Sequence, residues 1–350
     1  MEGRPGFPNG HGGGCRWRQT LSVRMARAAR RSAGPLAFVL AIGGAGTALA
    51  QDAWVPPKGE LGVSMTYQWL DADRHFFSGF EDPELTPFEI ATGVDRTSNV
   101  VDAGVVQAHS VAFDGELGVT DRLAVNGTLV GVVPRYVGNF AHPASTDDGT
   151  FHPSLQDATL GARYMLGDGL WAVTPFAQVT FPTRDYIVLA HASHGLGLSI
   201  LEVGASAGRI LVMGDTLGFI QGTYGYGFTE RPNEDIPMNR SRAQLQGGVF
   251  LGRVSLLGET NWRKVHGGIE WSDHAHGLDE LFSDHDQLAA IREWRYGAGV
   301  AFDVTPQAAV YFSFGDFIKG ANTHDARTIG FGISLSRQMF GGINLGDGLD

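Results

Sequence analysis

Residues 328–336 read TIGFGISLS and show the clearest structural pattern in the sequence. The apolar residues Ile329, Phe331, Ile333 and Leu335 alternate with glycine and serine, so one side of an extended chain is apolar and the other is small and polar. Residues 61–69, LGVSMTYQW, alternate in the same way. Because successive side chains of a β-strand point to opposite faces, this period of two predicts a sheet with one apolar and one polar face.

The same alternation continues along the chain from Glu60, with turn residues between the alternating segments. It predicts about twelve strands, an even number as in single-chain bacterial barrels. The predicted strands are 60–71, 104–119, 123–136, 155–166, 170–182, 197–211, 217–229, 241–252, 255–264, 290–303, 308–317 and 326–338.

The connections between these strands alternate between short and long. The short ones are 120–122, 167–169, 213–215, a reversal near Arg253, and 305–307. The long ones are 72–103, 137–153, 184–196, 230–240, 265–288 and 318–326. A soluble sandwich can share the alternation, but short turns on one rim and long loops on the other are typical of a transmembrane barrel. Both ends of the barrel segment then fall on the short-turn rim, which we expect to be periplasmic.

Aromatic residues near the predicted strand ends fit the girdles at the two membrane interfaces. They are Trp69, Tyr136, Trp171, Phe181, Tyr186, Trp262, Trp271 and Trp294.

The N-terminal region has the features of an export signal. Arginines at 24, 27, 30 and 31 precede an apolar run over 35–49, and the small residues Ala48 and Ala50 flank Leu49. This order predicts a signal peptide cleaved after Ala50, and we expect translation to start at Met25. The predicted organisation is a leader over 1–50, an outer-membrane barrel over 51–340 and a short tail over 341–350.

Charge and cysteine content exclude several functions. Residues 1–50 hold seven of the 26 basic residues and one of the 37 acidic residues, so the remainder has 19 basic and 36 acidic residues and a net charge of −17. Such a chain has no basic surface for nucleic acid. Its one cysteine, Cys15, lies in the predicted leader, which argues against disulfides and thiolate metal sites. We expect no cofactor.

Closure of the barrel requires the last predicted strand to pair with the first, since open edges cannot lie in hydrocarbon. Residues 328–335 resemble the terminal-strand signal of barrel-assembly machinery, although the last position is Leu335 instead of an aromatic residue and fifteen residues follow. The expected partners are this machinery, outer-membrane lipid, lipopolysaccharide and a small-molecule solute.

The residues on the polar face of the predicted barrel would line its lumen. The charged members are Asp114, Glu116, Asp157, Arg163, Glu202, Arg242, Glu259, Arg263 and Arg295. They would either set the selectivity of a path for small solutes or pair with one another to brace the barrel, and both roles are compatible. Barrels of about twelve strands are narrower than the water-filled channels of 16–18 strands.

Histidines and acids are dense in residues 271–286, WSDHAHGLDELFSDHD. His274, His276 and His285 offer nitrogen ligands for a divalent metal. The alternatives are a solvated acidic loop and carboxylates that bridge divalent cations to lipopolysaccharide.

Catalysis has little support in the sequence. The sequence matches Gly-x-Ser-x-Gly at 204–208 (GASAG), but this match lies inside the predicted strand 197–211 and not at the strand-to-helix turn of a nucleophile elbow. His109 and Ser110 are strand neighbours that point to opposite faces, and Ser193–His194 lies in a loop without an evident third member. An outer-membrane lipid hydrolase is the enzymatic alternative, and the expectation is that the chain is not an enzyme.

Three stretches are similar to a known family: 53–59 (AWVPPKG), 154–164 (SLQDATLGARY), and 166–176 (LGDGLWAVTPF) with 180–183 (TFPT). The sequence resembles the transporter-like outer-membrane barrels named for the meta-pathway of phenol degradation, with Gln156 where such proteins often have glycine. The resemblance implies passage of small hydrophobic or aromatic compounds across the outer membrane.

The sequence therefore predicts an all-β outer-membrane barrel that acts as a passive channel or transporter for small molecules. The alternative is a structural surface barrel with a plugged lumen that presents its loops. Residues 72–103 are either a plug folded into the mouth or an extracellular flap.

Overall fold

A computed structural model describes residues 53–76, 100–101, 104–138, 146–167, 170–185, 187–188, 190–231, 235–271 and 287–338. The predicted leader, the C-terminal tail and most of 72–103 lie outside these ranges.

Twelve strands form the barrel: β1 (Glu60–Phe76), β3 (Val105–Gly118), β4 (Leu123–Val137), β6 (Ala158–Tyr164), β7 (Trp171–Phe181), β8 (Ile200–Met213), β9 (Thr216–Thr229), β10 (Met238–Leu251), β11 (Val254–Gly267), β12 (Arg292–Thr305), β13 (Ala308–Ala321) and β14 (Thr323–Gln338). Two short strands, β2 (Val100–Val101) and β5 (Ser154–Leu155), pair with β1 and β4. No helix among the described residues is long and apolar enough to cross a membrane.

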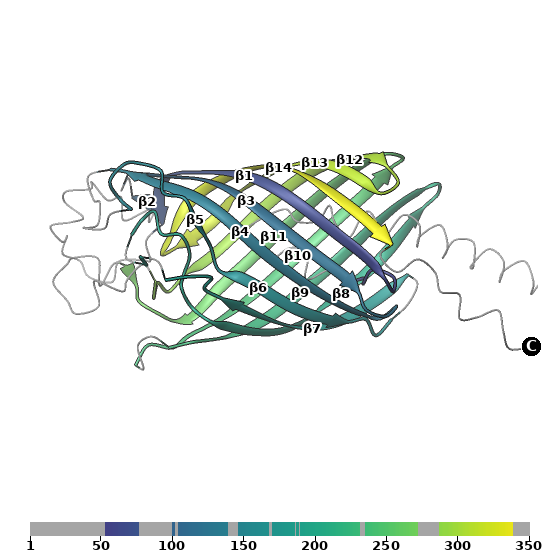
Figure 1. The fold of residues 1–350 in the computed structure, drawn as a ribbon, viewed down its shortest axis with the longest axis horizontal. Coiled ribbons are helices and arrows are strands. Elements are labelled where there is room, and N and C mark those ends of the chain that lie inside the picture. Colours follow the sequence, from purple (N-terminus) through teal and green to yellow (C-terminus); the bar gives the residue numbers. More distant parts are fainter. Residues whose placement is uncertain are drawn as a thin grey trace, which may run out of the picture.

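Each barrel strand pairs antiparallel with the next, and β14 returns to pair with β1. Figure 1 shows the resulting closed barrel with tilted strands. The closing ladder runs from Glu60 opposite Gln338 to Phe76 opposite Thr323. Pairing along this seam leaves no open sheet edge, which a barrel in hydrocarbon requires. The predicted twelve-stranded antiparallel barrel is confirmed.

Short turns gather at one end of the barrel, the short-turn rim. Two of them, between β8 and β9 and between β10 and β11, have only two residues. They begin at Gly214 (φ 63°) and Gly252 (φ 70°), a left-handed conformation that glycine adopts without steric cost. The other end is the loop rim, where the described segments 146–157, 182–185, 190–199, 230–231, 235–237, 268–271 and 287–291 lie between strands.

The long loop predicted over 318–326 is wrong. β13 continues to Ala321 and β14 begins at Thr323, so Asn322 alone joins the two strands. Asn322 has a φ of 50°, which asparagine tolerates better than most residues. Ile318 is an extra residue in the β12–β13 ladder, since Lys319 pairs with Trp294 and Phe317 pairs with Arg295. This bulge interrupts the period of two from which the strand end was predicted.

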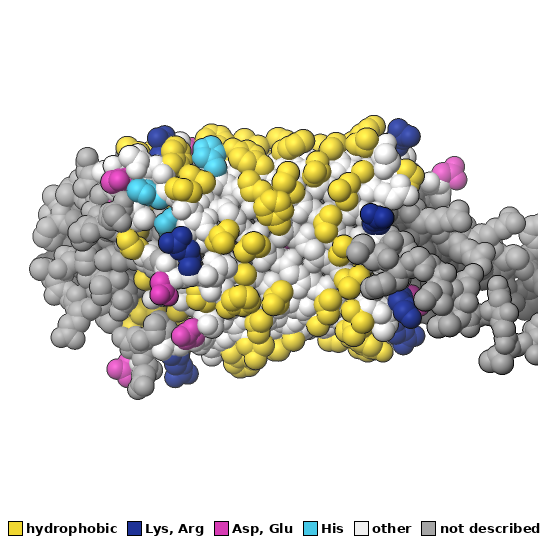
Figure 2. All heavy atoms as spheres, in the orientation of Figure 1, with side chains coloured by type: hydrophobic (Ala, Val, Ile, Leu, Met, Phe, Trp, Pro, Cys, Tyr) yellow, Lys and Arg dark blue, Asp and Glu magenta, His cyan; other side chains and the backbone are white. Residues whose placement is uncertain are grey.

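The two faces of the barrel differ as the alternation predicts. The outward side chains are large and apolar, and Figure 2 shows them as a broad band between two ends where charged side chains gather. Their inward neighbours, such as Ser64 and Thr66, are buried. Trp171, Trp262 and Trp294 are exposed on the outer face, as the girdle prediction requires.

Two predicted girdle residues are placed differently. Tyr136 and Trp271 are 0% and 7% exposed and lie on the inside at the loop rim. Tyr136 is an even-numbered residue of β4, and the even-numbered residues of this strand are the buried ones. Its parity therefore directs the ring into the barrel. Trp271 is held inside because its backbone N–H donates to the side-chain oxygen of Asn322 at 3.0 Å.

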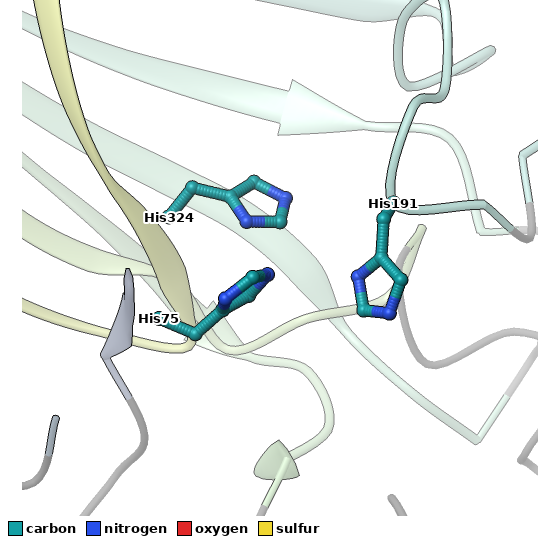
Figure 3. Close-up of side chains that lie close together, drawn as sticks. All are labelled: His75, His191 and His324. Carbon is teal, nitrogen blue, oxygen red and sulfur yellow. The ribbon is translucent and has the colours of Figure 1, made fainter. Parts of the chain in front are cut away.

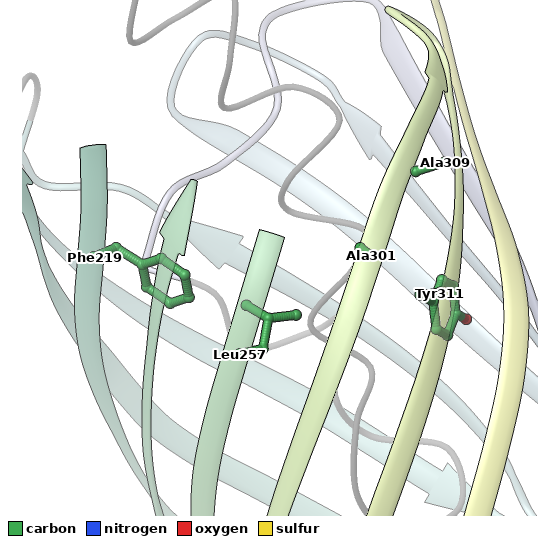
Figure 4. Packing of buried hydrophobic residues seen from close by; sticks show 5 residues of the cluster. All are labelled: Phe219, Leu257, Ala301, Ala309 and Tyr311. Carbon is green, nitrogen blue, oxygen red and sulfur yellow. The ribbon is translucent and has the colours of Figure 1, made fainter. Parts of the chain in front are cut away.

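An apolar patch lies on the inner wall. Figure 4 shows it spread over β9, β11, β12 and β13. Its members are Phe219, Leu257, Ala301, Ala309 and Tyr311, and we call them the apolar wall. The side chains of Trp54, Ile210 and Phe250 pack against it.

Candidate functional site in the barrel interior

The nine charged residues predicted for the lumen lie on the inward face. Asp114, Glu116, Arg163 and Glu202 are buried, and the other five are partly buried. Most take part in a small number of polar clusters, each of which joins two or more strands.

The first cluster joins β3 to β6 and β1. Arg163 Nε donates to Glu116 Oε1 at 2.5 Å, and both side chains are at most 1% exposed. Asp114 accepts hydrogen bonds from the hydroxyls of Thr128 at 2.7 Å and Ser64 at 3.3 Å. A buried ion pair of this kind is costly to break from one side, so this part of the interior braces the wall.

The second cluster reaches over β9 from β8 to β10. Arg242 donates to both carboxylate oxygens of Glu202, at 2.5 to 2.9 Å. Gly225 lies between them on β9, and a Cβ at that position would collide with the Glu202 carboxylate. The glycine therefore makes room for a charge pair that leans across its strand.

The third cluster surrounds Glu259. Its carboxylate accepts hydrogen bonds from the side-chain amides of Gln244 at 3.0 Å, Gln246 at 2.8 Å and Asn261 at 3.0 Å. Arg295 on the next strand lies with its guanidinium 4.7 Å from the Phe317 ring. Neutral donors, rather than a direct ion pair, hold this carboxylate on the inner wall.

A basic group occupies the interior nearer the loop rim. Arg263 lies 3.0 Å from Glu293. Arg240, one residue before the predicted start of its strand, is 9% exposed, and its Nε and Nη2 have no hydrogen-bond partner among the described residues. The inward side chains of β10 belong to even-numbered residues, so a predicted strand that began one residue earlier would have identified Arg240. Arg240 is thus an incompletely paired cation on the inner wall of the described barrel.

The segment before β1 enters the barrel at the short-turn rim. Ala53 is fully buried, its N–H donates to the Gln221 side chain at 3.1 Å, and its carbonyl accepts from the Thr174 hydroxyl at 2.5 Å. Both partners are inward residues of β9 and β7. Trp54 packs on the apolar wall. We call Ala53–Pro57 the N-terminal segment, and it fills part of the lumen.

The connection between β7 and β8 turns into the mouth at the loop rim. The Asp147 carboxylate accepts the backbone N–H groups of His191 at 3.1 Å and Ala192 at 3.0 Å. Asp157, one of the predicted lumen residues, accepts the N–H of Leu196 at 3.3 Å. Ala192 is buried together with Ala326 of β14, so this mouth loop, residues 187–199, reaches the closing seam of the barrel.

The predicted metal ligands His274, His276 and His285 lie outside the described residues. Three other histidines meet at the loop rim: His75 from β1, His191 from the mouth loop and His324 from β14. Figure 3 shows His75 and His324 on neighbouring strands, with His191 facing them from its loop. These histidines are far apart in the chain, and no spacing in the sequence joins them.

The described serine–histidine contacts do not form an accessible nucleophile. Ser241 Oγ lies 2.7 Å from His266 Nε2, but Ser241 is 3% exposed and its hydroxyl also contacts the Tyr224 hydroxyl. Ring nitrogen Nδ1 of His109 lies 2.7 Å from the Tyr67 hydroxyl, and His194 contacts the carbonyl of His152. These contacts connect neighbouring elements.

Three titratable groups in the loops have shifted pKa values. Hydrogen bonds from His152 and Thr150 lower the pKa of Asp148 to about 2. Hydrogen bonds from Ser199 lower the pKa of Glu230. Burial lowers the pKa of His194, with smaller effects from its neighbours.

The barrel is similar to several solved structures. One is an outer-membrane channel from Pseudomonas putida F1, which is 13% identical, covers 82% of this chain and 98% of its own, and has a TM-score of 0.55. Two others are the NanC porin (9% identical, 79% and 98% covered, TM-score 0.40) and the KdgM porin in complex with disordered oligogalacturonate (6%, 78% and 98%, TM-score 0.37). No protein-family model and no curated protein matches the sequence. The chain therefore shares the β-barrel fold of an outer-membrane channel, and the predicted location in the outer membrane agrees with that fold.

Proposed function

We propose that this chain is an outer-membrane channel for small molecules, which cross through the interior of the barrel. The observation that carries the proposal is the closed barrel with an apolar outer face and charged side chains inside. A soluble β-protein places its apolar side chains in the core, whereas this barrel turns them outward, as a membrane protein must. The Pseudomonas putida protein of the same fold is an outer-membrane channel, which supports the proposal.

The interior favours small solutes with an apolar part. Twelve strands enclose less space than the 16–18 strands of wide porins. The apolar wall holds the Trp54 indole, so an aromatic ring fits against it when that position is vacated. The resemblance to the phenol-degradation family extends the proposal to hydrophobic or aromatic compounds. Such compounds would pass next to the arginines and carboxylates of the inner wall.

Passage requires the N-terminal segment to move. Ala53 and Trp54 occupy the interior at the short-turn rim, and the mouth loop crosses the other end. We therefore propose a channel that opens when the N-terminal segment leaves the lumen. The same observation favours the second candidate, a permanently filled barrel that presents its loops at the surface.

Solute uptake into liposomes separates the two candidates. We expect vesicles that contain the Trp54→Ala variant to take up benzoate faster than a sugar of similar size. The further change Phe219→Ser, on the apolar wall, should reduce this preference, while Phe331→Ser on the outer face should not. Absence of uptake by a folded Trp54→Ala barrel, and by the barrel without residues 53–57, would favour the loop-presenting candidate.

A further inference from the structure

Three imidazoles converge where the first strand, the last strand and the mouth loop meet. His75 and His324 are directly opposite each other in the β1–β14 ladder, with ring centroids 4.3 Å apart. His191 approaches from the mouth loop, 5.3 Å from the His75 ring (Figure 3). One ring nitrogen of each residue lies within 4.8 Å of the other two. Nitrogen atoms, and not only ring edges, therefore lie close together.

A bulge in β1 directs His75 to this point. Inward residues of β1 are even-numbered up to Ala72, yet Asp73 and Arg74 are both exposed and His75 is 1% exposed. The β1–β14 register shifts between Ala72 and Arg74, which marks one extra residue. Bulges re-aim side chains in this way. Without the bulge, the odd-numbered His75 would point outward with Tyr67 and Trp69.

The third imidazole is held in place by its own surroundings. The Asp147 carboxylate accepts the N–H groups of His191 and Ala192, which fixes the backbone. The Tyr136 ring stacks on the His191 ring at 4.4 Å, with an interplanar angle of 24°. Trp271 lies beside both other rings, 6.2 Å from His75 and 5.9 Å from His324. A preorganised cage of this kind reduces the entropy lost when a ligand is bound.

We propose that His75, His191 and His324 form a binding site for a divalent transition-metal ion such as Zn²⁺. Imidazole is a preferred ligand of zinc, copper and nickel. Zinc–nitrogen bonds of about 2.0–2.1 Å place tetrahedral ligands roughly 3.4 Å apart, so small side-chain rotations bring the three nitrogens from their present separation to a bound ion. Three protein ligands leave a fourth position for water, a carboxylate or another donor.

The alternative to a metal site is an aromatic cluster that only packs the mouth. An aromatic cluster needs ring contacts, which Tyr136 and Trp271 provide. It does not need three ring nitrogens from three separate elements within 4.8 Å of one another. A bound ion would join β1, β14 and the mouth loop, and so hold the loop across the mouth next to the seam. The effect of that contact on passage rests on the proposed channel function, whereas metal binding itself does not.

Metal titration of the detergent-purified, chelator-stripped chain tests the site. We expect calorimetry to show one tight Zn²⁺ site per chain, and Co²⁺ to give the visible absorption of a site with nitrogen ligands. His191→Ala and His324→Gln should each weaken the binding by at least about 10–100-fold, the loss that even indirect changes at metal sites produce. The controls are His109→Ala on the outer face and the triple variant His274→Ala, His276→Ala and His285→Ala.

The controls make each outcome decisive. His191 lies in a loop, so its alanine variant should keep the heat-dependent gel shift of a folded barrel. Retention of tight binding in the triple variant, with loss in His191→Ala and His324→Gln, supports the proposal. No tight Zn²⁺ binding, or tight binding that survives both cluster variants and disappears in the triple variant, would overturn it. Either result leaves the channel proposal to be judged by uptake alone.

Discussion

At the scale of single residues, the interior depends on charges that are paired within the wall. The alternation of side chains along each strand is enough to place the nine charged residues inside. It fixes the face of each residue, since a shift of one residue would turn every side chain of the strand to the other face. The partners could not be predicted from sequence, since Arg242 reaches Glu202 across an intervening strand. The inward direction of His75 could not be predicted either, because a single bulge residue reverses it.

The Glu116–Arg163 pair gives a stability prediction. We expect Glu116→Gln to lower the free energy of unfolding by about 3–5 kcal/mol, because it leaves a buried guanidinium without its counter-charge. Replacing both residues, with Glu116→Gln and Arg163→Met, should cost clearly less. Urea unfolding followed by tryptophan fluorescence measures both.

The Arg263–Glu293 pair supplies a matched control. Its arginine side chain is 36% exposed, so Glu293→Gln should cost no more than about 1 kcal/mol, as expected for ion pairs in contact with water. Equal losses at the two pairs would show that burial does not set their contribution.

His194 gives a pH prediction for the mouth. Burial lowers the pKa of His194, and the nearby charges of Arg184 and His152 add to the lowering, while the hydrogen bond between Nε2 and the His152 carbonyl (3.1 Å) opposes it. The folded state therefore binds this proton less readily than the unfolded state, whose pKa is about 6.5. The contribution of neutral His194 to the free energy of unfolding is therefore present above the unfolded-state pKa. It is lost as the pH falls from there toward the lowered pKa of the folded state. We expect the thermal stability to fall over this range, and less steeply in His194→Gln.

At the scale of elements, the N-terminal segment and the β-strands differ in how far the sequence predicts them. All twelve barrel strands can be predicted because each keeps its own period of two over most of its length. The loop predicted over 318–326 is wrong because the bulge at Ile318 ends the alternation before the strand ends. The position of Ala53–Pro57 could not be predicted, because its contacts are with Gln221, Thr174 and the apolar wall, far away in the sequence.

Gly208 offers a way to displace the N-terminal segment without shortening the chain. A Cβ at Gly208 would lie 2.5 Å from the Trp54 ring and 2.7 Å from Ala53 Cβ, so Gly208→Ala should push the segment away from the wall. In an Ala53→Cys background, whose only other cysteine is Cys15 of the predicted leader, we expect faster thiol labelling at position 53. Gly258→Ala is the control, because a Cβ there meets nothing within 4 Å. Equal labelling rates in the two variants would contradict the packing described here.

At the scale of the whole molecule, three features close the barrel: one joins the sheet to itself and two occupy its ends. β14 pairs with β1 along the seam, the N-terminal segment occupies the short-turn end, and the mouth loop is bound at the loop rim. The first closure is required by the membrane. In the proposed channel, the other two determine whether a path exists, and the N-terminal segment can leave without breaking any hydrogen bond between barrel strands.

The most direct test of a channel closed by its N-terminal segment is single-channel conductance in planar bilayers. We expect little or no steady conductance for the chain that begins at residue 51. We expect stable conductance steps for the same barrel without residues 53–57, with the folded state of both confirmed by their heat-dependent gel shift. Equal conductance of the two forms, or none from the shortened and folded barrel, would show that the N-terminal segment does not close a channel.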